Sequence, residues 1–246
     1  MITSGDVAVD KLSNGDYKYT FIPSNIVKNG LVLWLNGLDF RNTSNKWKDQ
    51  SGYGNDATAY NLGYNLTSGS NGNGSVVFDG ADDYFSIANN ATLNPYKELT
   101  LEIKGSVFSN TKSYEANFID KFGYSNYRIG FTTTGYIHTT VTATNALNGT
   151  TYVDDYGGVY YPAKNTTFHA TYVYDGTNGL AKLYVNGLLH NQKTIESNMP
   201  IKNNNTSILI GKMLNYETIN GSLEMARIYN RALTSEEVLQ NYNAEK

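Results

Sequence analysis

The sequence predicts an all-β fold, a two-sheet antiparallel jelly-roll sandwich with one short C-terminal helix. Its 21 tyrosines, 9 phenylalanines and 23 glycines occur among many asparagines, serines and threonines, a composition typical of strands and turns. Short apolar or alternating segments recur along the chain and are separated by turn residues. With 246 residues, the chain is long enough for one large β domain with a full core.

Residues 99–107 carry the cleanest strand pattern. Leucine, isoleucine and valine alternate there with threonine, glutamate, lysine and serine. One face of this strand is therefore expected to meet water. Since an all-parallel sheet would bury both faces, the pattern favours antiparallel sheets.

The chain is expected to divide at residue 28. Residues 5–22 alternate on both sides of a turn at residues 13–15 and predict a hairpin. Two isolated strands are barely stable, so this hairpin must lean on something. Residues 1–28 are interpreted as a docking appendage or a junction to another subunit, and residues 29–246 as the jelly-roll domain.

Further strands are predicted along the main domain. Asn186 and Gly187 form the strongest two-residue hairpin signal in the chain. An acidic turn is expected within residues 76–87, between two short strands. The remaining predicted strands span residues 31–35, 117–122, 127–131, 136–143, 168–174, 180–185, 188–195 and 207–211.

The last segment predicts a strand that continues into a short helix. Thr234 and Glu237 have the spacing of a capping box, in which each side chain bonds the other residue's amide. Val238, Leu239 and Tyr242 form the apolar stripe that is expected to face the domain. Such a helix closes a domain and does no chemistry.

Charge and composition exclude several classes of function. The net charge of −3 comes without a basic run, which argues against nucleic acid as a partner. The absence of cysteine excludes disulfides and thiolate metal sites. No window is apolar enough for membrane insertion, and residues 1–20 lack a secretory leader. The chain is therefore expected to be a virion protein, or an extracellular or cell-surface protein whose leader was removed.

Four blocks resemble, in order, the laminin-G-like, concanavalin A-like jelly-roll family of the lectin/glucanase fold. They are LVLWL at residues 31–35 with DQSGYGND at 49–56, VFDGADDYFSI at 77–87, the segment from His169 to Gly187, and the segment from Ile210 through EMARIYNRALTSEEV at 224–238. The resemblance covers residue 30 to the end. It implies a curved antiparallel sandwich whose loops bind sugars or proteins, and a binding family rather than a catalytic one.

The resemblance also implies a structural calcium ion near the sheet edge. Asp39, Asp49, Asp79 and Glu224 are the candidate ligands, because calcium prefers several hard oxygen atoms. Glu224 departs from the family, which more often has aspartate there. The alternative is that the acids of residues 79–83 only form turns.

Catalysis finds little support in the sequence. A retaining glycosidase needs two carboxylates about 5 Å apart, and the Glu-x-Asp-x-Glu pattern that would place them on one strand face is absent. The neighbouring Asp154 and Asp155 would point to opposite faces of a strand. His138, His169 and His190 are scattered, without metal or triad spacing.

Residues 152–161 are the candidate ligand-binding segment. Tyrosines and aspartates gather there among glycines without any amphipathic pattern, and exposed aromatic loops are favoured recognition sites. The candidate contacts are Tyr152, Asp154, Asp155, Tyr156, Tyr160 and Tyr161.

Three functions stay open at this point. The first is a non-enzymatic recognition domain on a virion or cell surface, such as a bacteriophage appendage or head-decoration protein, which binds a glycan or surface polymer through sheet-edge loops. The second is a structural decoration module whose residues 5–22 dock to neighbouring virion subunits. The third is an accessory carbohydrate-binding domain of a polysaccharide-degrading enzyme.

Overall fold

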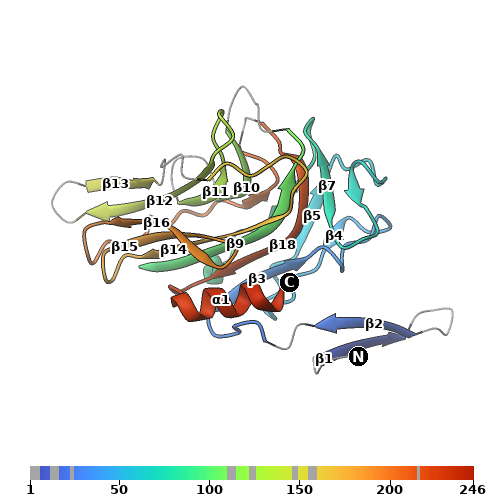
Figure 1. The fold of residues 1–246 in the computed structure, drawn as a ribbon, viewed down its shortest axis with the longest axis horizontal. Helices are drawn as coiled ribbons and strands as arrows, with labels where there is room; N and C mark the ends of the chain where they lie inside the picture. Colours follow the sequence, from blue (N-terminus) through green and yellow to red (C-terminus); the bar gives the residue numbers. More distant parts are fainter. Residues whose placement is uncertain are drawn as a thin grey trace.

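The computed structural model describes residues 6–11, 17–22, 25–109, 115–121, 126–145, 149–154, 160–214 and 217–246. Two eight-stranded antiparallel sheets stack face to face and confirm the predicted jelly-roll sandwich (Figure 1). A separate two-stranded sheet precedes them in the chain. Among the described helices, none is long and apolar enough to span a membrane.

The first large sheet is called here the β11 sheet. From edge to edge it contains β13 (Gly149–Asp154), β12 (Ile137–Asn145), β11 (Tyr127–Phe131), β10 (Ala116–Lys121), β17 (Ile208–Ile210), β8 (Tyr84–Ile87), β5 (Ala57–Tyr60) and β4 (Lys46–Trp47).

The second large sheet is called the β9 sheet. It contains β16 (Leu188–Thr194), β15 (Leu180–Val185), β14 (Phe168–Asp175), β9 (Glu98–Val107), β18 (Asn220–Tyr229), β7 (Val76–Asp79) and β6 (Gly69–Ser70), and β3 (Leu31–Asn36) also pairs with β18. Consecutive β7 and β8 belong to different sheets, so the turn between them crosses from one layer to the other. A short 3₁₀ helix, η1 (Ala91–Leu93), follows β8.

The main core fills the space between the sheets. Alternate residues of β9 enter it, and Phe40, Trp47 and Phe85 form a fully buried aromatic group with ring centroids 5.1–6.0 Å apart. Each such aromatic removes a large apolar area from water, which is the main stabilising contribution of the sandwich.

Helix α1 (Ser235–Ala244) packs on the outer face of the β9 sheet (Figure 1). The capping box of Thr234 and Glu237 is present, as the sequence predicts. The predicted apolar stripe is partly wrong: Val238 is fully buried, but Leu239 is 43% exposed, and Asn241 is buried in its place. The side-chain amide of Asn241 can be buried there because its hydrogen bonds are satisfied within the protein, as described below.

Helix α1 also changes the burial of the polar side of β9, the strand with the alternating pattern. The polar side of β9 was expected to meet water, yet Thr100 and Glu102 are fully buried. Helix α1 covers that part of the face together with Ile26 and Val27, which lie in the segment before β3. They form a second apolar cluster. The prediction therefore fails where α1 lies.

The N-terminal hairpin consists of β1 (Asp6–Lys11) and β2 (Tyr17–Ile22) and lies apart from both large sheets (Figure 1). Its pairing places Val7 opposite Phe21 and Val9 opposite Tyr19. Ile26 and Val27 already pack with the main body. The predicted division at residue 28 stays a prediction.

Candidate functional site

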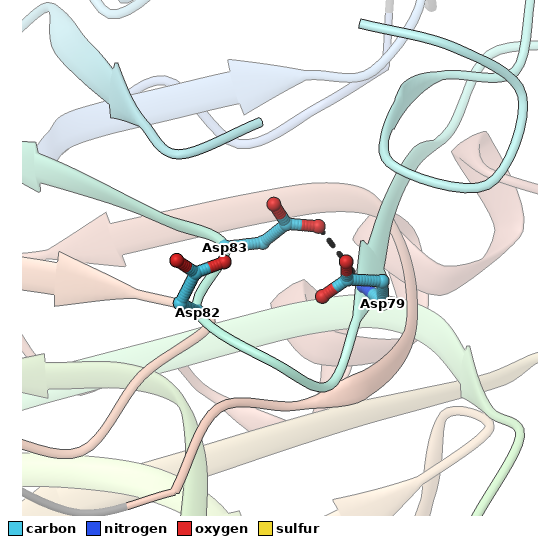
Figure 2. A group of neighbouring side chains, drawn as sticks. All are labelled: Asp79, Asp82 and Asp83. Carbon is cyan, nitrogen blue, oxygen red and sulfur yellow. Dashed lines mark hydrogen bonds between the residues drawn. The ribbon is translucent and has the colours of Figure 1, made fainter. Parts of the chain in front are cut away.

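The turn between β7 and β8 brings three carboxylates together. Oxygen atoms of Asp79, Asp82 and Asp83 all lie within 4.8 Å of one another, the single such group of three metal-ligating residues among the described residues. Figure 2 shows Asp83 between the other two. A sharp turn is possible because Gly80 adopts a φ of 80°, which a residue with a Cβ atom rarely takes.

The three carboxylates differ in their hydrogen bonds. Asp83 is fully buried; its Oδ1 accepts from Ser68 Oγ at 2.9 Å and its Oδ2 from the Asp79 amide at 2.9 Å (Figure 2). Burial raises the pKa of Asp83, and the charges of Asp79 and Asp82 raise it further. Asp79 and Asp82 are exposed, and Asp79 Oδ1 accepts from the Ala81 amide at 2.7 Å. Asp83 thus holds the turn, while Asp79 and Asp82 face solvent.

A cleft of about 390 Å³ opens beside this turn. It lies at the β6 edge of the β9 sheet and is lined by Leu66, Thr67, Asn71, Val77, Phe78, Asp79, Phe108 and Asn220. Leu66 is 71% exposed and Phe108 is 39% exposed, so both leave apolar surface open to solvent. Such a size and a mostly apolar lining are typical of small-ligand sites.

Two polar side chains in this cleft are paired by the sheet itself. Asp79 on β7 and Asn220 on β18 stand directly opposite each other in the antiparallel register. Side chains at opposite positions project from the same face and lie close together. The backbone of Asn220 also accepts the Phe108 amide at 2.9 Å, which fixes the aromatic wall beside the pair. A carboxylate and a carboxamide together can accept and donate hydrogen bonds to one hydroxyl-rich ligand.

Thr67 and Asn71 are committed to the loop that forms the other wall. Asn71 Oδ1 accepts the amides of Asn73 and Ser75, and its Nδ2 donates to Ser75 Oγ. Thr67 donates to Asn65 Oδ1. These bonds shape the wall, and they leave the ligand-facing chemistry to Asp79 and Asn220.

The four residues expected to hold calcium do not converge. Asp79 alone belongs to the acidic turn. The carboxylate of Asp49 accepts from the amides of Trp34, Ser51 and Asn55 and from Ser51 Oγ, so it organises its own loop.

Glu224 forms an ion pair with Lys104 at 2.9 Å and accepts from Thr167. Asp39 donates its amide to the Asn36 carbonyl within a turn. Among the candidate calcium ligands, Asp79 is the one that belongs to a group of three carboxylates within the described residues.

The predicted ligand-binding segment is partly described. Tyr152 and Asp154 lie in β13, whereas Asp155 and Tyr156 fall outside the described residues. Tyr160 packs edge-on against His190, with ring centroids 5.4 Å apart, and against the main core, and this burial raises its pKa. Tyr161 is 46% exposed and rests against Tyr136.

Leu66, Phe108 and Asn220 were missed by sequence reasoning. Asp79 was identified from a motif, but its partner lies 141 positions away on the strand that pairs with it only in the folded sheet. An asparagine just before a glycine at the start of a strand reads as a turn residue, so its sequence context gives no signal.

A family model described as the concanavalin A-like lectin/glucanases superfamily matches residues 79–239. The chain belongs to this superfamily. The matched segment begins at Asp79, the last residue of β7, and includes β18 with Asn220. No curated protein matches the sequence.

Solved structures with the superfamily's fold include receptor-binding domains of botulinum neurotoxins. The ligand-binding domain of serotype D in complex with N-acetylneuraminic acid is 17% identical with a TM-score of 0.64 and covers 89% of this chain. A type C neurotoxin structure concerned with two ganglioside molecules is 16% identical with a TM-score of 0.60 over 89% of this chain. A serotype DC binding domain in complex with rat synaptotagmin II is 14% identical with a TM-score of 0.61 over the same share. This chain covers 52% of each of these longer chains, and the likeness shows the fold alone.

Proposed function

We propose that the protein is a non-catalytic saccharide-binding domain and that the cleft beside the acidic turn holds the sugar. The observation that carries this proposal is the Asp79–Asn220 pair, set in register between the apolar side chains of Leu66 and Phe108. The carboxylate and carboxamide would bond adjacent sugar hydroxyls, and Phe108 would pack against the C–H face of the ring.

The carboxylates of the turn support binding better than hydrolysis. A glycosidase needs one carboxyl group on each side of the scissile bond. Both oxygens of Asp83 are occupied by internal hydrogen bonds, and Asp83 does not line the cleft. Asp79 is thus the one carboxylate of the turn that reaches the ligand space.

The binding test uses single substitutions that leave the fold intact. Immobilised neutral oligosaccharides are screened with the full chain, and each hit is then titrated by calorimetry. Asp79→Asn, Asn220→Ala and Phe108→Ala should each weaken binding at least tenfold, because each removes one face of the cleft. Asn205→Ala, which replaces an exposed asparagine outside the cleft, is the matched control. Unchanged affinity in all three variants would remove the cleft from consideration, and hydrolysis of any hit would contradict the non-catalytic part.

Calcium at the acidic turn is a second part of the proposal. Asp79 and Asp82 offer exposed carboxylate oxygens within reach of one another, the hard ligands that calcium takes. Calcium at about a hundredfold excess over its Kd should then stabilise the fold by about 2.7 kcal/mol. Asp82→Asn should abolish this rise in melting temperature, and Asp39→Asn should leave it unchanged. A melting temperature that EDTA and calcium leave equal would contradict a calcium site.

A surface location follows from a recognition role, and we extend the proposal to a virion or cell surface, with a bacteriophage appendage or head-decoration protein as the favoured setting. The support is the asparagine- and tyrosine-rich, cysteine-free composition together with a binding fold. Immunogold labelling of particles and cells with an antibody to the full chain tests this. Labelling confined to the cell interior would overturn it.

An assembly role is the second candidate, and the N-terminal hairpin favours it. The hairpin forms its own sheet, in which Val7 pairs with Phe21 and Val9 pairs with Tyr19. Two strands outside a larger sheet are barely stable alone, and we propose that a neighbouring subunit of the virion supplies the surface on which they dock. Deleting residues 1–24 retains Ile26 and Val27, which pack with the body. The truncated chain should bind saccharide as before and fail to attach to particles; attachment at the full level would exclude the hairpin as the docking element.

A further inference from the structure

An exposed aromatic pair lies on the outer face of the β11 sheet, away from the cleft. Tyr60 on β5 and Tyr84 on β8 stand opposite each other, and their rings stack in parallel, with centroids 4.9 Å apart and an interplanar angle of 8°. The core residues of these strands, such as Ala59 and Phe85, point the other way. Tyr60 keeps 43% of its surface exposed.

The two rings differ in what covers their remaining faces. Lys212 Nζ lies 4.5 Å from the centroid of the Tyr84 ring. Gly211 makes this possible: it adopts a φ of 84°, and any Cβ there would collide with the Phe78 ring at 2.3 Å. The chain therefore leaves β17 sharply, and the next side chain lies over Tyr84.

The second face of Tyr60 points toward β4. The pairing of β5 with β4 ends at Thr58, so no strand residue stands opposite Tyr60 on that side. The Tyr60 side chain keeps 43% of its surface exposed, so part of the ring beyond Tyr84 is open to solvent. An open aromatic face with a negative π-surface packs well against the C–H groups of a sugar ring.

Two lysines give this surface its charge. Lys46 lies beside the pair and donates to Thr58 Oγ1 at 2.6 Å, and Lys212 lies at its other end. Among the described residues, neither lysine has a carboxylate within ion-pair distance, whereas the neighbouring Lys48 is paired with Asp56. Both ammonium groups can therefore meet an anion that arrives at the tyrosines.

We propose that Tyr60, Tyr84, Lys46 and Lys212 form a second binding site, one for a saccharide that carries a carboxylate. The sugar ring stacks on the open face of Tyr60, and the carboxylate takes the charge of the lysines. Thr58 and Ser86, on the same face, supply hydroxyl partners. The proposal rests on the saccharide-binding function but uses a surface distinct from the cleft, because none of its residues lines that cleft.

The test compares ligands that differ in one charged group. Sialyllactose and lactose form one pair, and oligogalacturonate and its methyl ester form the other. The acidic member of each pair should bind at least tenfold more tightly than its neutral counterpart. Its affinity should fall as sodium chloride rises, because exposed charges are screened by salt.

Variants then locate the site. Tyr60→Ala should abolish binding of the acidic saccharides, and the Lys46→Gln, Lys212→Gln double variant should remove the preference for the charged ligand. Tyr96→Ala, at a tyrosine that is 69% exposed elsewhere on the surface, is the matched control. Far-ultraviolet circular dichroism and the melting temperature verify that each variant is folded.

The outcomes separate the two proposals. Loss of acidic binding in Tyr60→Ala but not in Asp79→Asn supports the second site. Loss in Asp79→Asn alone assigns the ligand to the cleft and overturns the second site. Equal binding of charged and neutral ligands, no binding of either, or tighter binding of a single-stranded oligonucleotide also overturns it.

Discussion

The two halves of the outer face of the β9 sheet contain similar polar side chains, but those side chains have different roles in the two halves. In the covered half, helix α1 lies over Glu102, which bonds Arg227 at 3.1 Å, His169 at 2.8 Å and Asn241 at 3.0 Å. In the open half, Asp79 and Asn220 stand side by side at the cleft. A polar group under the helix needs a hydrogen-bond partner within the protein because burial removes its contact with water. A polar group in the open half is hydrated and remains accessible to a ligand. The cover, rather than the residue type, decides which role a polar side chain has.

The outer face of the β11 sheet repeats this contrast. Arg128 and His138 are buried there, with Arg128 paired to Glu115 at 2.8 Å and to His138 Nε2 at 3.2 Å. At the other end of the sheet, Tyr60 is exposed and Tyr84 is half-buried beneath Lys212. Both faces therefore combine a structural, charged region with an accessible one.

The largest effect is expected from breaking the covered half. Arg227→Met keeps much of the side-chain volume but leaves the Glu102 carboxylate buried without its cation, which should cost about 3–5 kcal/mol of unfolding free energy. Urea denaturation at neutral pH measures this. Arg231→Met is the matched control, since the Arg231–Glu237 pair is partly exposed and such pairs contribute about 1 kcal/mol or less.

The double variant Glu102→Gln, Arg227→Met sharpens the same point. Burial alone would raise the pKa of Glu102, but Arg227 and His169 outweigh it and hold that pKa below its ordinary value. Without the negative charge, the loss of Arg227 should cost less than it does in the wild-type background. Equal costs in both backgrounds would show that the charge pairing has no special role.

The next effect is a pH dependence from the covered region of the β11 sheet. Burial, with a smaller contribution from the charge of Arg128, lowers the pKa of His138 to about 3. The unfolded chain binds a proton near pH 6.5 while the folded chain does not, so stability is full above pH 6.5 and falls as the pH drops toward 3. At pH 4 the loss is on the order of 3 kcal/mol. The carboxylate of Glu115, 3.7 Å from His138 Nδ1, favours the protonated ring and so opposes part of this loss of stability.

Urea denaturation from pH 7 to pH 4 measures this slope in the wild type and in His138→Gln. The variant should be less stable at pH 7, because it loses a buried hydrogen-bonding ring, and its slope should be shallower. His190→Gln, at an exposed position on β16, is the control. Parallel slopes in wild type and His138→Gln would mean that another group dominates the acid response.

A smaller effect is expected from loosening the cover itself. Thr234→Ala removes the N-cap acceptor for the Glu237 amide and should cost about 1 kcal/mol. Hydrogen exchange should show faster opening of α1 before the rest of the sandwich. Thr133→Ala, at an exposed turn position, should change stability by less than about 0.5 kcal/mol. Indistinguishable variants would argue that packing alone seats the helix.

The sequence predicts the sandwich well because local signals and the fold agree. The strand at residues 99–107, the Asn186–Gly187 turn and the capping box at Thr234 each depend on signals within a few residues, and each is confirmed. The packing of α1 over the outer face of the β9 sheet, in contrast, depends on tertiary contacts. Neither the burial of Glu102 nor the exchange of Leu239 for Asn241 can be read from periodicity, because both depend on which surface the helix meets.

The candidate site is harder to predict for the same reason. Asp79 is recognisable within its motif, but Asn220 and Phe108 join it only through the pairing of β18 with β7 and β9. Tyr160 shows the reverse difficulty: its glycine-rich surroundings resemble an exposed loop, yet its ring packs on Phe168 and His190. Composition indicates which side chains a segment contains, and the order of the strands in the sheet determines which other residues those side chains contact.

The smallest stability effect is expected in the open half, and it separates the two halves most directly. Asp79→Asn keeps an oxygen that can accept the Ala81 amide, and Asn220→Ala leaves the backbone bond to Phe108 in place. Neither variant strands a buried charge, so each should change the unfolding free energy by less than about 0.5 kcal/mol, as exposed substitutions usually do. Urea denaturation beside Arg227→Met makes the comparison. If either variant lost several kcal/mol, the Asp79–Asn220 pair would belong with the buried network as a structural feature, and its free hydrogen-bonding groups could no longer be assigned to a ligand.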